Sequence, residues 1–269
     1  MGKLIRMDLY RMFKSRASVI CLALALVLAL GSAPLGKLVY VLGNSLSPEI
    51  NDVFPTTVNL SDLLGDPFPL LNAMLTLLSL CFFFYADVEN GYIKNIAGQM
   101  PMKGFTVLSK FQASVVHNLI FAAVGIIGNL IGTVIVQRII VDGAVLDSIR
   151  VLVLKLLLLQ SLCAILLLVV STFHSKALGM ILAVLFGLGL TSVIYLGINA
   201  GLQQIFGEAT DISQYMPDAV MGETPLDTVK AIVVAVVTGG IFLPLAIRIF
   251  DRKDVKYRGP IWQVAVCEQ

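Results

Sequence analysis

The sequence predicts an all-α membrane protein, a single transmembrane domain over residues 1–269 with about six transmembrane helices. Hydrophobic residues make up 58% of the 269 residues and charged residues only 13%, and the mean hydropathy is +0.91. The remaining polar residues are too few to cover a water-soluble protein of this size. Apolar stretches of about 20 residues provide the spans, and Lys and Arg are distributed unevenly between alternate loops.

The predicted spans lie between charged flanks, because a helix needs about 20 residues to cross a hydrocarbon core of about 30 Å. They cover residues 17–35, 67–86, 111–136, 151–173, 177–199 and 229–247. Pro34 is expected to kink a first helix that continues toward Leu42. The segment 200–228, which contains Pro217 and Pro225, is expected to hold short re-entrant or interfacial helices.

Residues 1–16 are predicted to form an amphipathic helix at the membrane surface. Apolar residues recur there at helical spacing opposite basic ones: Ile5, Leu9, Met12 and Phe13 against Lys3, Arg6 and Lys14. The sequence Gly31-Ser32-Ala33 superficially resembles the cleavage site of a signal peptide. Pro34 directly after it argues against cleavage, so we expect this helix to be retained.

The basic residues predict the orientation of the chain, because Lys and Arg are retained on the cytoplasmic side of short loops. Most of them fall on one side of the predicted topology: the first 16 residues, the loop 87–110, Lys176 and the tail 248–269. Both termini are therefore expected in the cytoplasm, and the chain in the cytoplasmic membrane of a bacterium. The opposite loops are acidic, which would attract cationic substrates or would merely reflect the exclusion of basic residues from that side.

Several functional classes find little support in the sequence. The basic residues are scattered rather than gathered on one face, so no nucleic-acid partner is expected. No phosphate-binding loop, zinc-protease motif or nucleophile elbow occurs, and the four cysteines lack the spacing of a metal site. His117 is the one candidate base for an intramembrane enzyme, and a histidine that packs between helices is the simpler interpretation. We expect no catalytic residues, no bound metal and no cofactor.

Neutral polar residues lie inside the predicted spans, whereas carboxylates near the middle of the bilayer are missing. They either line a translocation path or form hydrogen bonds between helices. The candidates for a path are Asn72, Thr76, Asn129, Gln160 and Asn199, and Asn118 is a further polar residue of the third span. Two small-residue faces, Gly125, Gly128 and Gly132 in one span and Gly197 with Gly201 in another, suggest close helix contacts within or between subunits.

The most informative segment is the loop from Asp87 to Lys110, between the second and third predicted spans. Its acidic and amide residues favour the beginning of a helix, and its apolar residues project from one face and Lys94 from another. The segment is either a short cytoplasmic helix that contacts a partner or a solvated connector. The residues assigned to the contact are Asp87, Glu89, Asn90, Gly91, Ile93, Lys94 and Ile96.

Three features of the chain resemble the permease subunits of type-two ABC exporters, which are related in fold to the G subfamily of ABC transporters. The opening Met7-Asp8-Leu9-Tyr10-Arg11-Met12-Phe13-Lys14-Ser15 is similar to their amphipathic elbow helix. The run Glu89-Asn90-Gly91-Tyr92-Ile93-Lys94-Asn95-Ile96, followed by Leu108-Ser109-Lys110, resembles their coupling-helix loop. The run Ile249-Phe250-Asp251-Arg252-Lys253-Asp254-Val255-Lys256 resembles the basic end of their last span.

The resemblance implies a transport subunit rather than an enzyme. It would pair with a second permease, identical or homologous, and with two cytosolic ATPase subunits that bind ATP and Mg²⁺. The segment 87–98 would then be the coupling helix, with Asp87, Glu89 and Lys94 as polar contacts and Ile93 and Ile96 as apolar anchors. Peptides, including antimicrobial peptides, are the leading substrate class, followed by small hydrophobic drugs or lipids.

Two alternatives from other classes remain. One is a secondary transporter without an ATPase, which the missing midplane carboxylate and the lack of an internal repeat disfavour. The other is a membrane immunity protein or an intramembrane enzyme without a motor. A partner ATPase distinguishes these alternatives from the permease.

Overall fold

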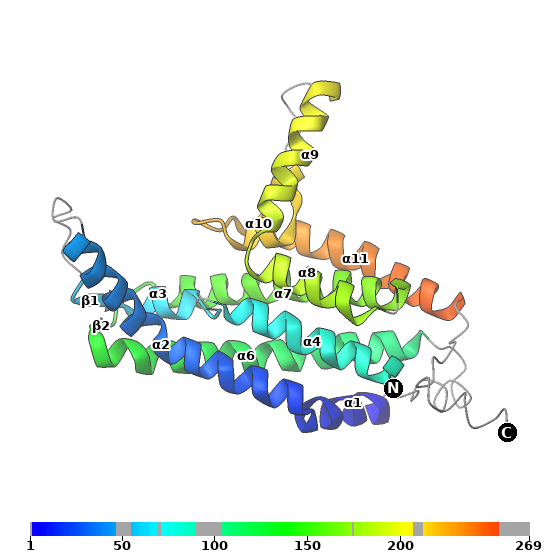
Figure 1. Cartoon of the computed structure of the whole chain (residues 1–269), viewed down its shortest axis with the longest axis horizontal. Helices are drawn as coiled ribbons and strands as arrows, with labels where there is room; N and C mark the ends of the chain where they lie inside the picture. Colours follow the sequence, from blue (N-terminus) through cyan, green and yellow to red (C-terminus); the bar gives the residue numbers. More distant parts are fainter. Residues whose placement is uncertain are drawn as a thin grey trace.

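The computed structural model describes residues 2–46, 55–68, 71–89, 104–173, 175–206 and 212–252, and these residues are mostly helical (Figure 1). The long helices are α2 (Arg16–Leu46), α6 (Phe105–Val136), α7 (Val145–Phe173) and α11 (Thr228–Arg252). The shorter elements are α1 (Gly2–Lys14), β1 (Thr57–Asn59), α3 (Leu60–Gly65), α4 (Asn72–Glu89), β2 (Arg138–Ile140), α8 (Lys176–Gly187), α9 (Thr191–Phe206), the 3₁₀ helix η1 (Ile212–Tyr215) and α10 (Pro217–Met221).

The helices α2, α4, α6, α7, α8 and α11 lie side by side and form a bundle (Figure 1). Its core contains a large cluster of aliphatic and aromatic side chains, of which Leu77, Leu80, Leu159 and Leu166 are completely buried, together with buried polar residues such as Asn72 and His117. Large apolar side chains also point outward from the long helices; Val27, Ile135 and Val236 are each more than 60% exposed. Helices that are apolar on the inside and the outside are typical of a protein surrounded by lipid.

Four described helices are long and apolar enough to cross a membrane: α2 over Arg16–Leu42, α6, α7 and α11. The sequence predicted spans in all four places. The helix α4 also lies where a span was predicted, but its apolar part, Asn72–Ala86, is shorter. The helix α2 continues through Pro34, as expected.

The fifth predicted span, 177–199, is not one straight helix. The structure divides it into α8 and α9, which meet at an angle of 87°, so the pair is a broken span or a re-entrant loop. Gly187, the last residue of α8, packs so closely on α4 that a Cβ there would lie 2.2 Å from the Cα of Met74. Gly189 then turns the chain with φ of +67°, a conformation that favours glycine. Counting the bent pair as one span gives five, and the sixth remains a prediction.

The segment 200–228 contains the short helices η1 and α10, and their re-entrant or interfacial position remains a prediction. They pack against α9, which projects sideways from the bundle (Figure 1). Tyr195 on α9 donates a hydrogen bond to Asp218 on α10 at 2.9 Å, and Thr191 donates to the same carboxylate. The polar side of α9 is thus turned inward, and Val193 and Leu196 are exposed on its other side.

The first helix, α1, lies where the sequence predicted a helix, and one side of it is buried. Leu4, Asp8 and Met12 are buried, whereas Phe13, on the apolar side of the helix, is 43% exposed. These buried residues are spaced by four along α1 and face α6. Asp8 occupies this stripe because it accepts a hydrogen bond from Ser109.

The glycines of α6 provide close contacts within this chain. A Cβ on Gly132 would lie 2.3 Å from the carbonyl oxygen of Leu30, and one on Gly128 would lie 2.6 Å from the Cβ of Ala29. Only glycine permits α2 and α6 to approach this closely. Around Gly197 and Gly201 on α9, in contrast, the described residues leave open space.

Basic residues predominate at one end of the bundle and acidic residues at the other. At one end, which we call the basic end, lie α1, the beginning of α6 and the end of α11, with Arg11, Lys14, Lys110, Arg248 and Arg252. The other, acidic end carries the loops with Asp62, Asp66, Asp142, Glu223 and Asp227. There β1 and β2 pair in parallel, with Val58 opposite Ile139 (Figure 1). The sequence did not predict these strands, because each has only three residues.

Candidate functional site

A group of polar contacts lies at the basic end, where the chain leaves α4 and re-enters α6. We call Asp8, Gly104, Ser109, Lys110 and Asp251 the basic-end cluster. Its members come from α1, α6 and α11 and from Gly104, the residue before α6. The cluster therefore connects helices that are distant in the sequence at the two attachment points of segment 90–103.

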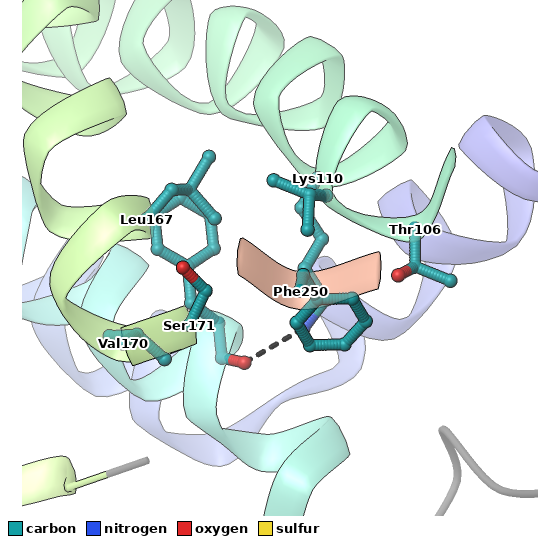
Figure 2. Close-up of a pocket in the computed structure, with 8 residues that line it drawn as sticks. Thr106, Lys110, Leu167, Val170, Ser171 and Phe250 are labelled. Atoms are coloured by element: carbon teal, nitrogen blue, oxygen red, sulfur yellow. Dashed lines mark hydrogen bonds between the residues drawn. The ribbon is translucent and has the colours of Figure 1, made fainter. Parts of the chain in front are cut away.

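Lys110 is the central residue of this cluster. Its ammonium nitrogen donates a hydrogen bond of 2.8 Å to the carbonyl oxygen of Phe84 (Figure 2). It also lies 3.4 Å from the carbonyl oxygen of Phe83 and 5.2 Å from the centroid of the Phe83 ring. Only 5% of the residue is exposed. A cation near the carboxyl end of a helix is stabilised by the carbonyl dipoles and by the face of an aromatic ring. Lys110 thus joins α6 to the last turns of α4.

Two carboxylates complete the cluster. The hydroxyl of Ser109 donates a hydrogen bond of 2.5 Å to Asp8, which is also buried, and this bond joins α1 to α6. The backbone N–H of Gly104 donates a hydrogen bond of 2.5 Å to Asp251 near the end of α11. A carboxylate at the amino end of a helix interacts favourably with its free N–H groups and its dipole. A Cβ on Gly104 would lie 2.6 Å from Ile247, so a larger residue would disturb this contact.

A narrow pocket of about 20 Å³ lies beside the cluster. Lys110 and Thr106 line it from α6, Leu167, Val170 and Ser171 from α7, and Phe250 from α11 (Figure 2). Its volume is close to that of a single water molecule. The pocket is too small for a transported substrate, so it is a packing gap between helices.

The predicted contact residues of the coupling helix lie next to the cluster or beyond the described chain. Asp87 and Glu89 belong to the last turn of α4 rather than to the beginning of a new helix. Asn90, Gly91, Ile93, Lys94 and Ile96 lie outside the described residues. Their assignment to an ATPase contact stays a prediction.

The structure distributes the five predicted path residues over several helix contacts instead of bringing them together. Asn129 on α6 accepts a hydrogen bond of 2.7 Å from Ser32 on α2. Asn199 on α9 accepts one of 2.9 Å from the backbone N–H of Ile212. Thr76 donates to the carbonyl oxygen of Asn72 at 2.7 Å, within α4. These contacts favour a role in helix packing.

Asn72 is the exception among these five residues. It is completely buried, and neither its amide nitrogen nor its amide oxygen has a hydrogen-bond partner among the described residues. A Cβ on Gly125 would lie 3.4 Å from this nitrogen, so the amide faces α6. A buried amide without a partner is costly, so the contacts among the described residues do not explain Asn72 as they explain Asn129, Asn199 and Thr76.

Gln160 connects α7 to α6 through hydrogen bonds from both ends of its amide. Its nitrogen donates to Ser114 at 2.9 Å and to the carbonyl oxygen of Phe111 at 3.0 Å. Its oxygen accepts from Asn118 at 2.9 Å. The side chain is therefore an interhelical bridge.

We predict that Gln160→Leu destabilises the protein by about 1 kcal/mol, because the amide of Asn118 and the hydroxyl of Ser114 then lose their shared partner. Thermal unfolding of the purified chain in detergent measures this loss. Gln203→Leu on exposed α9 is the matched control and should unfold at the temperature of the unmodified chain. Equal unfolding temperatures for all three proteins would contradict a bridging role for Gln160.

The sequence indicated the position of this site but not its contacts. Asp8 and Ser109 were noted as parts of the flanking helix and loop, and Lys110 as the end of that loop. The spacing of the sequence could have indicated that Asp8 is buried. Asp8 lies four residues after Leu4 and four before Met12, so the three side chains share one face of α1, and this face is buried. Within the described part of the chain, no group of three or more His, Cys, Asp or Glu residues is arranged to hold a metal ion.

The mostly helical bundle, its apolar outer surface and its four or five candidate spans define the chain as an all-α membrane protein. A comparison with models of known protein families finds no match, and a comparison with curated proteins finds none either.

Proposed function

We propose that this chain is the permease subunit of an ATP-driven exporter and that a separate ATPase drives it through segment 90–103. One observation carries the proposal: the basic-end cluster joins four helices at the two attachment points of this segment. Lys110 joins α6 to α4, Ser109 joins α6 to Asp8 on α1, and Asp251 joins α11 to the beginning of α6. The resemblance of the segment to a coupling-helix loop supports the same proposal.

The basic-end cluster could transmit a displacement of segment 90–103 to the helices of the bundle. A partner that displaces segment 90–103 pulls on the end of α4 and the beginning of α6 together, because Lys110 ties them to each other. The contacts with Asp8 and Asp251 then pass the displacement to α1 and α11. ATP-driven closure of the partner would in this way shift the bundle between two access states.

The proposed substrate class is a peptide or another amphipathic molecule. The acidic end gives cationic substrates weaker support than the sequence suggested, since several of its carboxylates have partners within the chain. Lys155 lies 3.5 Å from Asp66, Lys230 lies 2.5 Å from Glu223, and Ser61 donates to Asp142. These contacts favour a structural role for much of the negative charge.

We predict that Glu89→Arg and Ile93→Asp each weaken ATPase binding by about 2 kcal/mol, or about thirtyfold, because they reverse a charge and bury a carboxylate in the proposed contact. Co-purification of the chain with an ATPase encoded beside it measures the loss. Lys37→Glu, a charge reversal on an exposed part of α2 toward the acidic end, is the control and should retain the ATPase. Substrate transport by the chain alone in liposomes would contradict the proposal and support a secondary transporter.

A further inference from the structure

A second cavity lies between α1, α2 and α6. Its volume is about 80 Å³, and Phe13, Ser18, Val19, Leu22, His117, Ile120 and Phe121 line it. Ser18 and His117 form its polar part, and both are more than nine-tenths buried. Phe13 and Val19 are 43% and 54% exposed, so this crevice opens toward the outside of the bundle.

The two polar residues of the crevice have unused hydrogen-bonding atoms. The hydroxyl of Ser18 and the Nδ1 atom of His117 are buried and have no partner among the described residues. Nε2 of His117 lies 3.0 Å from the hydroxyl of Ser79 on α4, and the ring stacks on Phe121 at 4.4 Å. When Ser79 donates to Nε2, Nδ1 carries the proton, and the crevice then holds two donors.

Exposed basic residues define the depth of the crevice in the membrane. Ser18 is the third residue of α2, and Arg16 and Lys14, just before it, are exposed. Such side chains lie at the headgroup region or reach toward it. The crevice therefore lies close to the boundary between headgroups and acyl chains, where the ester carbonyls of phospholipids are found.

We propose that this crevice binds a phospholipid of the leaflet at the basic end through an ester carbonyl, which accepts hydrogen bonds from Ser18 and His117. A carbonyl oxygen has two lone pairs and can satisfy both donors. The acyl chain then lies along the exposed Val19 and the half-buried Ile120, and Lys14 and Arg16 are positioned for the phosphate. Buried water molecules are the competing occupant. This site goes beyond the proposed function, because it needs neither the ATPase nor a transported substrate.

Native mass spectrometry tests the proposal. The full chain is reconstituted with phosphatidylglycerol, either the ester-linked lipid or its diether analogue, and is released from detergent micelles. We expect the chain to retain the ester lipid about fivefold better than the diether lipid for each hydrogen bond formed. Ser18→Ala should reduce this preference by the same factor, because it removes a donor and leaves the apolar walls intact.

A matched pair of variants tests the location of the site. Val19→Trp places an indole at the exposed rim and should abolish lipid retention, whereas Ile20→Trp, at the next and equally exposed position outside the crevice, should leave it unchanged. Equal retention of the ester and diether lipids by the unmodified chain would overturn the proposal. The same holds if Val19→Trp retains the lipid, or if the unmodified chain retains none and the crevice holds water.

Discussion

Gly132→Val is expected to lower the free energy of unfolding by about 3 kcal/mol, the upper end of the range for overpacked cores. The reason is the close approach of α6 to α2, where a Cβ would lie 2.3 Å from the backbone oxygen of Leu30. Backbone atoms cannot rotate away as a flexible side chain can, so the two helices must separate along their contact. Thermal unfolding of the chain in detergent measures the change.

The control for this prediction is Gly240→Val. Gly240 also lies inside a long apolar helix, α11, but a Cβ there meets nothing within 4 Å among the described residues. Any cost of β-branching in a helix is the same at the two positions, so their difference isolates the steric contact. If the two variants unfold at the same temperature, the close packing of α6 on α2 does not hold in the membrane protein.

Lys110→Met is expected to reduce ATP-driven transport at least tenfold while binding of the ATPase is retained. A tenfold loss corresponds to about 1.4 kcal/mol of coupling free energy between the ATPase and the helix bundle. Methionine fills a similar volume but cannot donate to the carbonyl oxygens of Phe83 and Phe84. The end of α4 and the beginning of α6 then lose their direct connection. Transport and ATPase retention are measured with the same reconstituted complex.

Lys155→Met serves as the control for this experiment. Lys155 pairs with Asp66 at the opposite, acidic end, so the substitution removes a charge without touching the basic-end cluster. Its transport should stay within about twofold of the unmodified complex, because ion pairs with an exposed partner contribute little. Full transport by Lys110→Met would refute the role of the cluster, and loss of ATPase binding would place Lys110 in the contact instead.

Much of the helical architecture could be predicted because the membrane imposes a simple requirement on the chain. In a bilayer each long span must satisfy its backbone hydrogen bonds internally and present apolar side chains to lipid. The helices α2, α6, α7 and α11 therefore appear where the hydropathy of the sequence placed them. The charged loops between them are clear markers, and the short helices around Pro217 follow from the breaks in the apolar pattern.

The break between α8 and α9 could not be predicted from composition, because residues 177–206 contain no charge and suit a straight helix equally well. The packing of Gly187 against Met74 and the positive φ of Gly189 decide the direction of α9. A hydropathy pattern shows neither the close approach of Gly187 to Met74 nor the backbone conformation of Gly189.

The site was predictable only in its position along the chain. Residues 87–110 were selected for their helix-forming and charged residues, but the basic-end cluster depends on Asp8 and Asp251, which lie 101 and 147 residues from their partners in the sequence. The apolar environment explains why these contacts are made, since a buried carboxylate or ammonium group without partners would be costly. The identity of each partner follows from the packing of α1 and α11 on α6.

The sequence by itself determined that this is a membrane protein, roughly where its four long helices lie along the chain, and which loops carry positive charge. These properties depend on the solvent preference of each residue, which acts locally along the chain. The tertiary structure alone decided which polar groups meet, such as Lys110 with the end of α4 and Gln160 with Asn118, and that Ser18 and His117 line the same open crevice. Such meetings depend on how helices distant in the sequence pack, and small residues such as Gly132 set their separation.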